Sequence, residues 1–120
     1  MPKILIIEDD ETMLSLLETF LQIEGFDVTV YSGKNIESPL RVIRQEVPEV
    51  ILMDVHLQNG NGMEITRQIR KDPALKPIRV IMTSGMEMSH QSFSAGADGF
   101  LLKPYMPEDL VRMIRNHSAM

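Results

Sequence analysis

Short apolar runs alternate with segments of helical periodicity along the whole chain. The run at residues 3–7 is continuous and rich in β-branched residues, which is typical of a strand that is covered on both faces. Residues 27–31 alternate instead, like a strand near the sheet edge. In all, the pattern predicts five strands, at residues 3–7, 27–31, 49–53, 78–82 and 99–102. Because strands and helices alternate, we expect an α/β fold with one doubly wound, five-stranded parallel sheet and five helices on its two faces.

Apolar faces mark the first three predicted helices. The first face consists of Met13, Leu14, Leu17, Phe20 and Leu21, and Gly25 is the expected C-cap. The second consists of Ile36, Leu40, Ile43 and Val47, in a helix that accommodates Pro39 only within its first turn. The third helix is expected over residues 63–71, after a loop at residues 59–62.

The last two helices have signals of different strength. Residues 85–95 contain three serines and no clean apolar stripe, so we expect a short or mobile helix there. Pro107, Glu108 and Asp109 open the final helix, and Arg112 and Arg115 close it. That order of charges matches the helix macrodipole.

Length and charge limit the classes of protein to which the chain can belong. Its 120 residues are expected to form one domain, residues 1–120, with a single core. The net charge of −5 argues against direct binding to nucleic acid or to an acidic membrane. The sequence has no cysteine, and its N-terminus leads straight into a strand with no signal peptide, so we expect a cytoplasmic location.

Polar side chains stand at the ends of four of the five predicted strands. Glu8, Asp9 and Asp10 follow the first strand, Asp54 the third, Thr83 and Ser84 the fourth, and Lys103 with Pro104 the fifth. In open parallel sheets, ligands bind beyond the carboxyl ends of the strands. Carboxylates, hydroxyls and one ammonium are therefore expected to meet at one sheet edge, and this edge is the candidate site.

Three carboxylates so close together need compensating positive charge. Mg²⁺ together with Lys103 would neutralise them, and ligands that are all oxygen favour Mg²⁺ over zinc. We expect Asp9 and Asp54 to be direct ligands and Glu8 to act through water, with the backbone carbonyl of His56 completing the set. Asp10 is instead interpreted as the N-cap of the first helix.

A carboxylate beside a metal, a lysine and a hydroxyl is equipped to accept a phosphoryl group. Asp54 would attack phosphorus and form a mixed anhydride, while Lys103 pairs with a phosphoryl oxygen. Thr83 would offer its hydroxyl to another oxygen, although Ser84 is equally able to supply one.

The chain resembles the receiver domains of response regulators in two-component signalling. The resemblance is carried by four stretches: ILIIEDD, LMD with LQNGNG, IMTSG and GFLLKP. It implies a CheY-like, flavodoxin-like fold with strand order 2-1-3-4-5. It also implies that Asp54 is the phospho-acceptor, that Asp9 and Glu8 bind the metal, that Thr83 and Phe100 are the switch residues and that Lys103 is the essential lysine.

The same resemblance implies that the Lys103–Pro104 peptide bond is cis. Two positions depart from the family pattern. Gln58 stands where the family commonly has proline, which predicts a looser loop after Asp54. Phe100 replaces the more usual tyrosine, and our hypothesis is that the ring turns inward more readily and biases the domain toward its active form.

Other classes of protein share parts of this residue set. A haloacid-dehalogenase-type phosphohydrolase would use the spacing of Glu8, Asp10 and Thr12, but with a glutamate at the position of the nucleophilic aspartate. A flavodoxin-like module would need a glycine-rich loop after the first strand, where this chain has acidic residues. A pseudo-receiver that only binds other proteins is the third alternative.

The sequence therefore predicts a phosphorylation-dependent signalling switch rather than a metabolic enzyme. Its phosphoryl donor would be a sensor histidine kinase or a phosphotransfer protein. The response would appear on the face formed by the fourth helix, the fifth strand and the last helix, where a downstream effector or an output domain would dock. The sequence leaves open a homodimer linked to phosphorylation.

Overall fold

Five parallel strands form one sheet in the computed structural model, which describes residues 1–32, 38–58 and 60–118. They are β1 (Lys3–Glu8), β2 (Asp27–Ser32), β3 (Val50–Asp54), β6 (Arg79–Ser84) and β7 (Gly99–Leu102). Their order across the sheet is β2-β1-β3-β6-β7, and every neighbouring pair is parallel. Counted along the chain, this is the order 2-1-3-4-5 that we expected.

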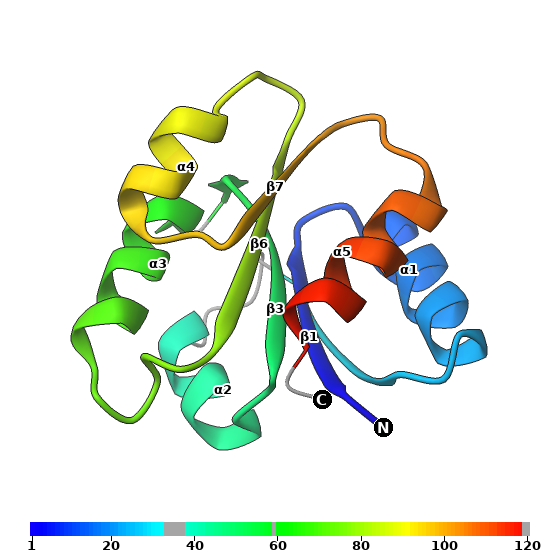
Figure 1. Ribbon diagram of the computed structural model, residues 1–120, viewed down its shortest axis with the longest axis horizontal. Coiled ribbons are helices and arrows are strands. Elements are labelled where there is room, and N and C mark those ends of the chain that lie inside the picture. The colour runs from blue at the N-terminus through cyan, green and yellow to red at the C-terminus, as the bar shows by residue number, and fades with distance from the viewer. Residues whose placement is uncertain (33–37, 59, 119–120) are drawn as a thin grey trace.

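Helices cover both faces of this sheet (Figure 1). The five in the described part of the chain are α1 (Glu11–Ile23), α2 (Pro39–Glu46), α3 (Gly62–Lys71), α4 (Ser89–Ala95) and α5 (Pro107–His117). α1 and α5 lie on one face, and α2, α3 and α4 lie on the other (Figure 1). None of these helices has both the length and the apolar character needed to cross a membrane. The expected fold class is confirmed.

Alternate residues of the central strands β1, β3 and β6 are buried in two separate core clusters. In β1, Ile4 and Ile6 pack with apolar residues of α1 and α5, whereas Leu5 and Ile7 pack with those of α2 and α3. All four side chains are fully buried. Both sides of the strand are therefore apolar, which explains the continuous apolar runs in the sequence.

Strand boundaries differ from the predicted ones mainly at polar residues. β2 continues to Ser32, β3 covers Val50–Asp54 rather than residues 49–53, and β6 covers Arg79–Ser84 rather than residues 78–82. The added residues pair with their neighbours, as Asp54 does with Thr83. Strand pairing uses backbone groups, so hydrophobicity alone underestimates the length of a strand that ends in polar side chains.

The first two helices end at residues other than the predicted ones. Glu24, not Gly25, is the C-cap of α1, and Gly25 follows it with a φ of 96°. Glycine is favoured directly after a helix because this left-handed conformation is strained for other residues. α2 begins at Pro39, so this proline lies in the first turn as expected, and the helix ends at Glu46, with Val47 as its C-cap. Ile36 lies outside the described residues.

A small hairpin replaces part of the loop that we expected before α3. β4 (His56–Leu57) pairs antiparallel with β5 (Gly60–Asn61). Asn61 then caps α3, because its side chain accepts a 2.8 Å hydrogen bond from the Met63 N–H. The helix therefore starts at Gly62, one residue before the predicted start.

The fourth helix is short, as expected, and is anchored at its C-terminal end. Arg70 of α3 donates to the Gly96 carbonyl at 2.8 Å and to Asp98 Oδ2 at 2.7 Å. Within α4, the Ser92 hydroxyl is buried without a hydrogen-bond partner among the described residues. α4 is thus fixed to α3 at one end and carries an unsatisfied polar group.

Candidate functional site

The polar residues at the strand ends meet at the C-terminal edge of the sheet. β1 ends at Glu8, β3 at Asp54 and β6 at Ser84, and Lys103 directly follows β7. Asp54 and Thr83 are partners in the register of neighbouring strands. Paired strands lie about 4.8 Å apart, so the topology alone places these side chains within reach of one another.

Lys103 joins two of the carboxylates. Its Nζ lies 2.8 Å from Glu8 Oε1 and 2.9 Å from Asp54 Oδ2. Burial alone would lower the pKa of Lys103, but the hydrogen bonds and charges of Glu8 and Asp54 raise it above its usual range. The lysine is therefore a permanent cation in direct contact with Asp54.

Glu8 is the most deeply buried acidic residue of the site, with 5% of its surface exposed. Besides its contact with Lys103, it accepts a 2.8 Å hydrogen bond from the Asp9 N–H at Oε2. Burial raises the pKa of Glu8 above its ordinary value of 4.5, although the hydrogen bond from Lys103 opposes this change. Glu8 therefore acts in this structure as a partner of the lysine.

Asp9 projects from the connection between β1 and α1, and its two oxygens have different surroundings. Oδ2 accepts a 2.6 Å hydrogen bond from the backbone N–H of Gln58. Oδ1 is buried and has no hydrogen-bond partner among the described residues. An unpartnered carboxylate oxygen in a buried position needs a cation or a proton donor.

The three expected metal-binding carboxylates are not gathered into one ready-made set. Among the described residues, no three His, Cys, Asp or Glu side chains are grouped closely enough to hold a metal ion. Two of these carboxylates, Glu8 and Asp54, contact the Lys103 ammonium instead. Mg²⁺ often takes only one or two carboxylates and keeps several waters. The unpartnered Oδ1 of Asp9 is compatible with that mode of binding.

The two candidate hydroxyls have different environments. Thr83 is buried, and its hydroxyl makes no hydrogen bond with the described residues. Ser84 Oγ, in contrast, accepts a 3.0 Å hydrogen bond from the Met86 N–H. Thr83 also stands opposite Asp54 in the sheet register, whereas Ser84 pairs with Leu102. This arrangement favours Thr83 over Ser84 as the hydroxyl that faces Asp54.

Phe100 lies on β7 opposite Met82 of β6. Its ring is partly buried and packs against the core cluster on the α2 and α3 side of the sheet. This position alone does not test whether the ring turns inward more readily than a tyrosine. The comparison that tests the hypothesis requires a second state of the domain, so the bias toward the active form stays a prediction.

Three further predicted residues have definite places in the structure. Asp10 is the N-cap of α1, where its Oδ1 accepts a 3.1 Å hydrogen bond from the Met13 N–H. The Lys103–Pro104 peptide bond is cis. His56 lies in β4, and its backbone N–H donates to Asp54 Oδ1 at 3.1 Å. The metal-binding role of its carbonyl is not tested by this geometry.

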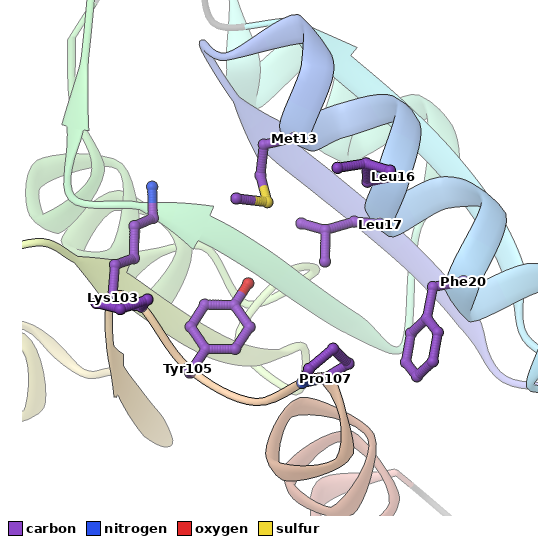
Figure 2. A pocket seen from close by; sticks show the side chains of 8 residues that line it. Met13, Leu16, Leu17, Phe20, Lys103, Tyr105 and Pro107 are labelled. Carbon is purple, nitrogen blue, oxygen red and sulfur yellow. The ribbon is translucent and has the colours of Figure 1, made fainter.

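An apolar groove of about 620 Å³ runs beside the site between α1 and the segment that leads into α5. Figure 2 shows its lining side chains, which include Met13, Leu16, Leu17 and Phe20 of α1 and, across the groove, Lys103, Tyr105 and Pro107. Burial raises the pKa of Tyr105 to about 12, although the charge of Lys103 opposes this change. The sequence does not mark Tyr105 as a residue that lines a groove beside the site, because an aromatic residue after a strand is usually only a core residue.

A comparison with known families shows the family of the chain. A family model described as a response regulator receiver domain matches residues 4–115. The chain belongs to the response regulator receiver domains. Domains of this family are signalling switches and not enzymes of metabolism, and response regulators interact with histidine kinases and output domains.

Relatives with known names are longer than this receiver domain. It is 35% identical over 117 residues to the response regulator ArlR of Staphylococcus saprophyticus, covering 96% of this chain and 51% of that protein. It is 28% identical over 113 residues to the DNA-binding response regulator MtrA of Mycobacterium tuberculosis, covering 94% of this chain and 49% of that protein. The receiver domain thus spans about half the length of the curated relatives it matches.

Solved structures agree with the fold over nearly the full length. A putative response regulator from Chloroflexus aurantiacus superimposes with a TM-score of 0.85 at 30% identity, covering 96% of this chain and 95% of that one. The chemotaxis response regulator CheY4 of Vibrio cholerae gives a TM-score of 0.86 at 23% identity, covering 97% and 98%. At that identity the second likeness concerns the fold alone.

Proposed function

We propose that this receiver domain, taken as residues 1–120, is a switch that is turned on by phosphorylation of Asp54. The observation that carries the proposal is the contact between Lys103 Nζ and Asp54 Oδ2 at 2.9 Å. It gives the acceptor carboxylate a cation that can pair with the oxygens of an incoming phosphoryl group. Thr83, the register partner of Asp54, supplies a hydroxyl that is not engaged elsewhere among the described residues.

The donor would be the phosphohistidine of a sensor kinase or of a phosphotransfer protein. An Asp54 oxygen forms the new P–O bond while the P–N bond of the phosphohistidine breaks. The imidazole leaves with the bonding electron pair and takes up a proton from water. The product is an aspartyl phosphate, in which the charge of about −1.5 to −2 draws the Lys103 ammonium and the Thr83 hydroxyl toward it.

Mg²⁺ would be held by Asp9, Asp54 and the His56 carbonyl, with Glu8 acting through water. When bound, it would neutralise charge on the phosphoryl oxygens. The support for this set is its all-oxygen chemistry and the buried, unpartnered Asp9 Oδ1. Lys103 keeps Asp54 and Glu8 in place in the absence of the cation.

The output would be a change on the face formed by α4, β7 and α5. Met82, next to Thr83 in β6, pairs with Phe100 of β7, so displacement of the hydroxyl and movement of the ring are linked through two adjacent strands. Phe93 of α4 and Leu102 of β7 are large exposed apolar side chains on these elements. A downstream effector, an output domain or a second phosphorylated copy would bind here.

One observation weighs against a phosphohydrolase of the haloacid-dehalogenase type. That reading needs Asp10 as a free acid near the nucleophile, but its side chain is occupied by capping α1. The pseudo-receiver reading would leave the contact of Lys103 with Asp54 without a chemical role.

Intact mass after treatment with acetyl phosphate and Mg²⁺ tests the proposed function. The expected result is one phosphoryl adduct on the wild-type chain and none on Asp54→Asn, which keeps the size of the side chain but not its charge. Adding a chelator should prevent the adduct on the wild type. Equal labelling of both proteins would move the acceptor elsewhere, and no labelling of either would favour the pseudo-receiver.

A further inference from the structure

A backbone hydrogen bond ties the two loops that carry the proposed metal ligands. The Gln58 N–H donates to Asp9 Oδ2 at 2.6 Å, although 49 residues separate the two positions. Asp9 stands between β1 and α1, while Gln58 directly follows β4, the strand that contains His56. One short bond therefore connects the Asp9 loop to the loop that begins at Asp54.

This bond makes the two oxygens of the Asp9 carboxylate unequal. Oδ2 is satisfied by the amide, and Oδ1 is buried without a partner among the described residues. With Oδ2 fixed, the carboxylate cannot rotate to exchange its oxygens without losing the hydrogen bond. Oδ1 is then the oxygen that remains available to a cation.

We propose that the backbone amide of Gln58 is a positioning group that orients Asp9 for Mg²⁺. The inference rests on the proposed function, because it concerns the metal that supports phosphorylation. Hydrogen bonds from outside the metal's own ligand set fix ligand orientation, and losing one typically weakens metal binding 10–100-fold. The Gln58 side chain itself is exposed, so the argument concerns only its N–H.

The resemblance to the family makes this amide a distinctive feature of the chain. Receiver domains commonly have proline at the position of Gln58, and proline has no backbone N–H to donate. The contact with Asp9 is therefore one that the common family residue cannot make. The expectation of a looser loop is not tested by the structure, but the loop gains an anchor that proline would not provide.

Two substitutions separate the amide from the side chain. Gln58→Pro removes the N–H and installs the residue common in the family, whereas Gln58→Ala removes the side chain and keeps the N–H. Mg²⁺ alone is titrated into each protein by isothermal titration calorimetry. We expect Gln58→Pro to bind Mg²⁺ about tenfold more weakly than the wild type, and Gln58→Ala to bind it as the wild type does.

Thermal unfolding with and without Mg²⁺ excludes a merely structural role. The rise in unfolding temperature that Mg²⁺ causes is compared between the variants, because this difference cancels the effect of proline on the metal-free fold. We expect a smaller rise for Gln58→Pro than for Gln58→Ala. Equal Mg²⁺ affinity of Gln58→Pro and wild type, with phosphoryl labelling of the wild type intact, would overturn the inference alone. A wild type that neither binds Mg²⁺ nor accepts a phosphoryl group would instead remove the proposed function.

A measurement on the wild type covers the case in which Gln58→Pro does not fold. The Gln58 amide should exchange with solvent deuterium much more slowly than the amide of an unbonded loop residue. It should also shift in the ¹⁵N–¹H spectrum when Mg²⁺ is added. Exchange at the rate of a free loop amide would overturn the inference.

Discussion

Lys103 Nζ donates a 2.9 Å hydrogen bond to Asp54 Oδ2, across 49 residues of sequence. The proposed acceptor therefore has its counter-charge in place before any phosphoryl group arrives. The same ammonium also holds Glu8, so that two carboxylates from adjacent strands share one cation.

Replacing Lys103 with methionine should destabilise the fold. Glu8 and Asp54 would lose their charged donor while remaining largely shielded from water, and such a loss costs about 1–3 kcal/mol of unfolding free energy. Urea unfolding at neutral pH measures this difference. Lys71→Met, which removes an exposed lysine at the end of α3, is the matched control and should have little effect. Equal stabilities of the two variants would show that the Lys103 contacts contribute nothing.

The contribution of Glu8 to folding stability should change with pH in the direction opposite to that of a typical surface carboxylate. Burial raises the pKa of Glu8 in the folded state above 4.5, so the folded protein holds this proton more tightly than the unfolded chain. Its contribution to stability is therefore complete below pH 4.5 and is lost as pH rises through the folded pKa. Relative to Glu8→Gln, the wild type should gain stability as the pH falls from neutrality toward that value. Denaturant unfolding of both proteins across this range is the measurement, and a constant difference would contradict the prediction.

Gly62 should tolerate no side chain. A Cβ at this position would collide with the backbone carbonyl of Asp54 and with the Met82 side chain. Because the first of these is backbone, Gly62→Ala should cost about 1–3 kcal/mol and displace the acceptor, which lowers phosphoryl labelling. Gly85→Ala is the control for folding, since nothing lies within 4 Å of its added Cβ. Unfolding curves and intact mass report the two effects, and normal labelling of Gly62→Ala would refute the second.

Ser92→Ala should make the protein more stable. The Ser92 hydroxyl is fully buried without a hydrogen-bond partner among the described residues, and such a group costs about 1–3 kcal/mol. Ser94→Ala, on the exposed side of α4, controls for the higher helix propensity of alanine. The stabilisation should be larger at position 92, and thermal unfolding can compare the two variants. Equal gains would assign the whole effect to helix propensity.

The sheet and its order could be anticipated because parallel strands need apolar residues on both faces. β1 shows the reason, since Ile4 and Leu5 point to different core clusters and both must be apolar. Strand ends could not be placed as well, because Thr83 and Ser84 pair through their backbones and have polar side chains. The β4 and β5 hairpin was missed because two-residue strands have no periodicity to detect.

The meeting of Asp54, Thr83 and Lys103 followed from topology, since all stand at the same edge of one sheet. The pairing of Glu8 with Lys103 did not follow, because the sequence does not reveal which carboxylate a flexible lysine reaches. The Gln58 amide was also beyond sequence reasoning. Every residue except proline carries the same backbone donor, so no residue type marks where that donor is used.

The alternation of core residues along β1 also protects the chemistry at its end. Sliding this strand by one position would turn Ile4 and Ile6 toward α2 and α3, and Leu5 and Ile7 toward α1 and α5. Each of these four close-packed side chains would then face the core cluster on the other side of the sheet, which is packed around different side chains. The misfit penalises any pairing that would carry Glu8 away from Lys103. Hydrophobic packing in the interior of the sheet thus sets the alignment of the charged side chains at its C-terminal edge.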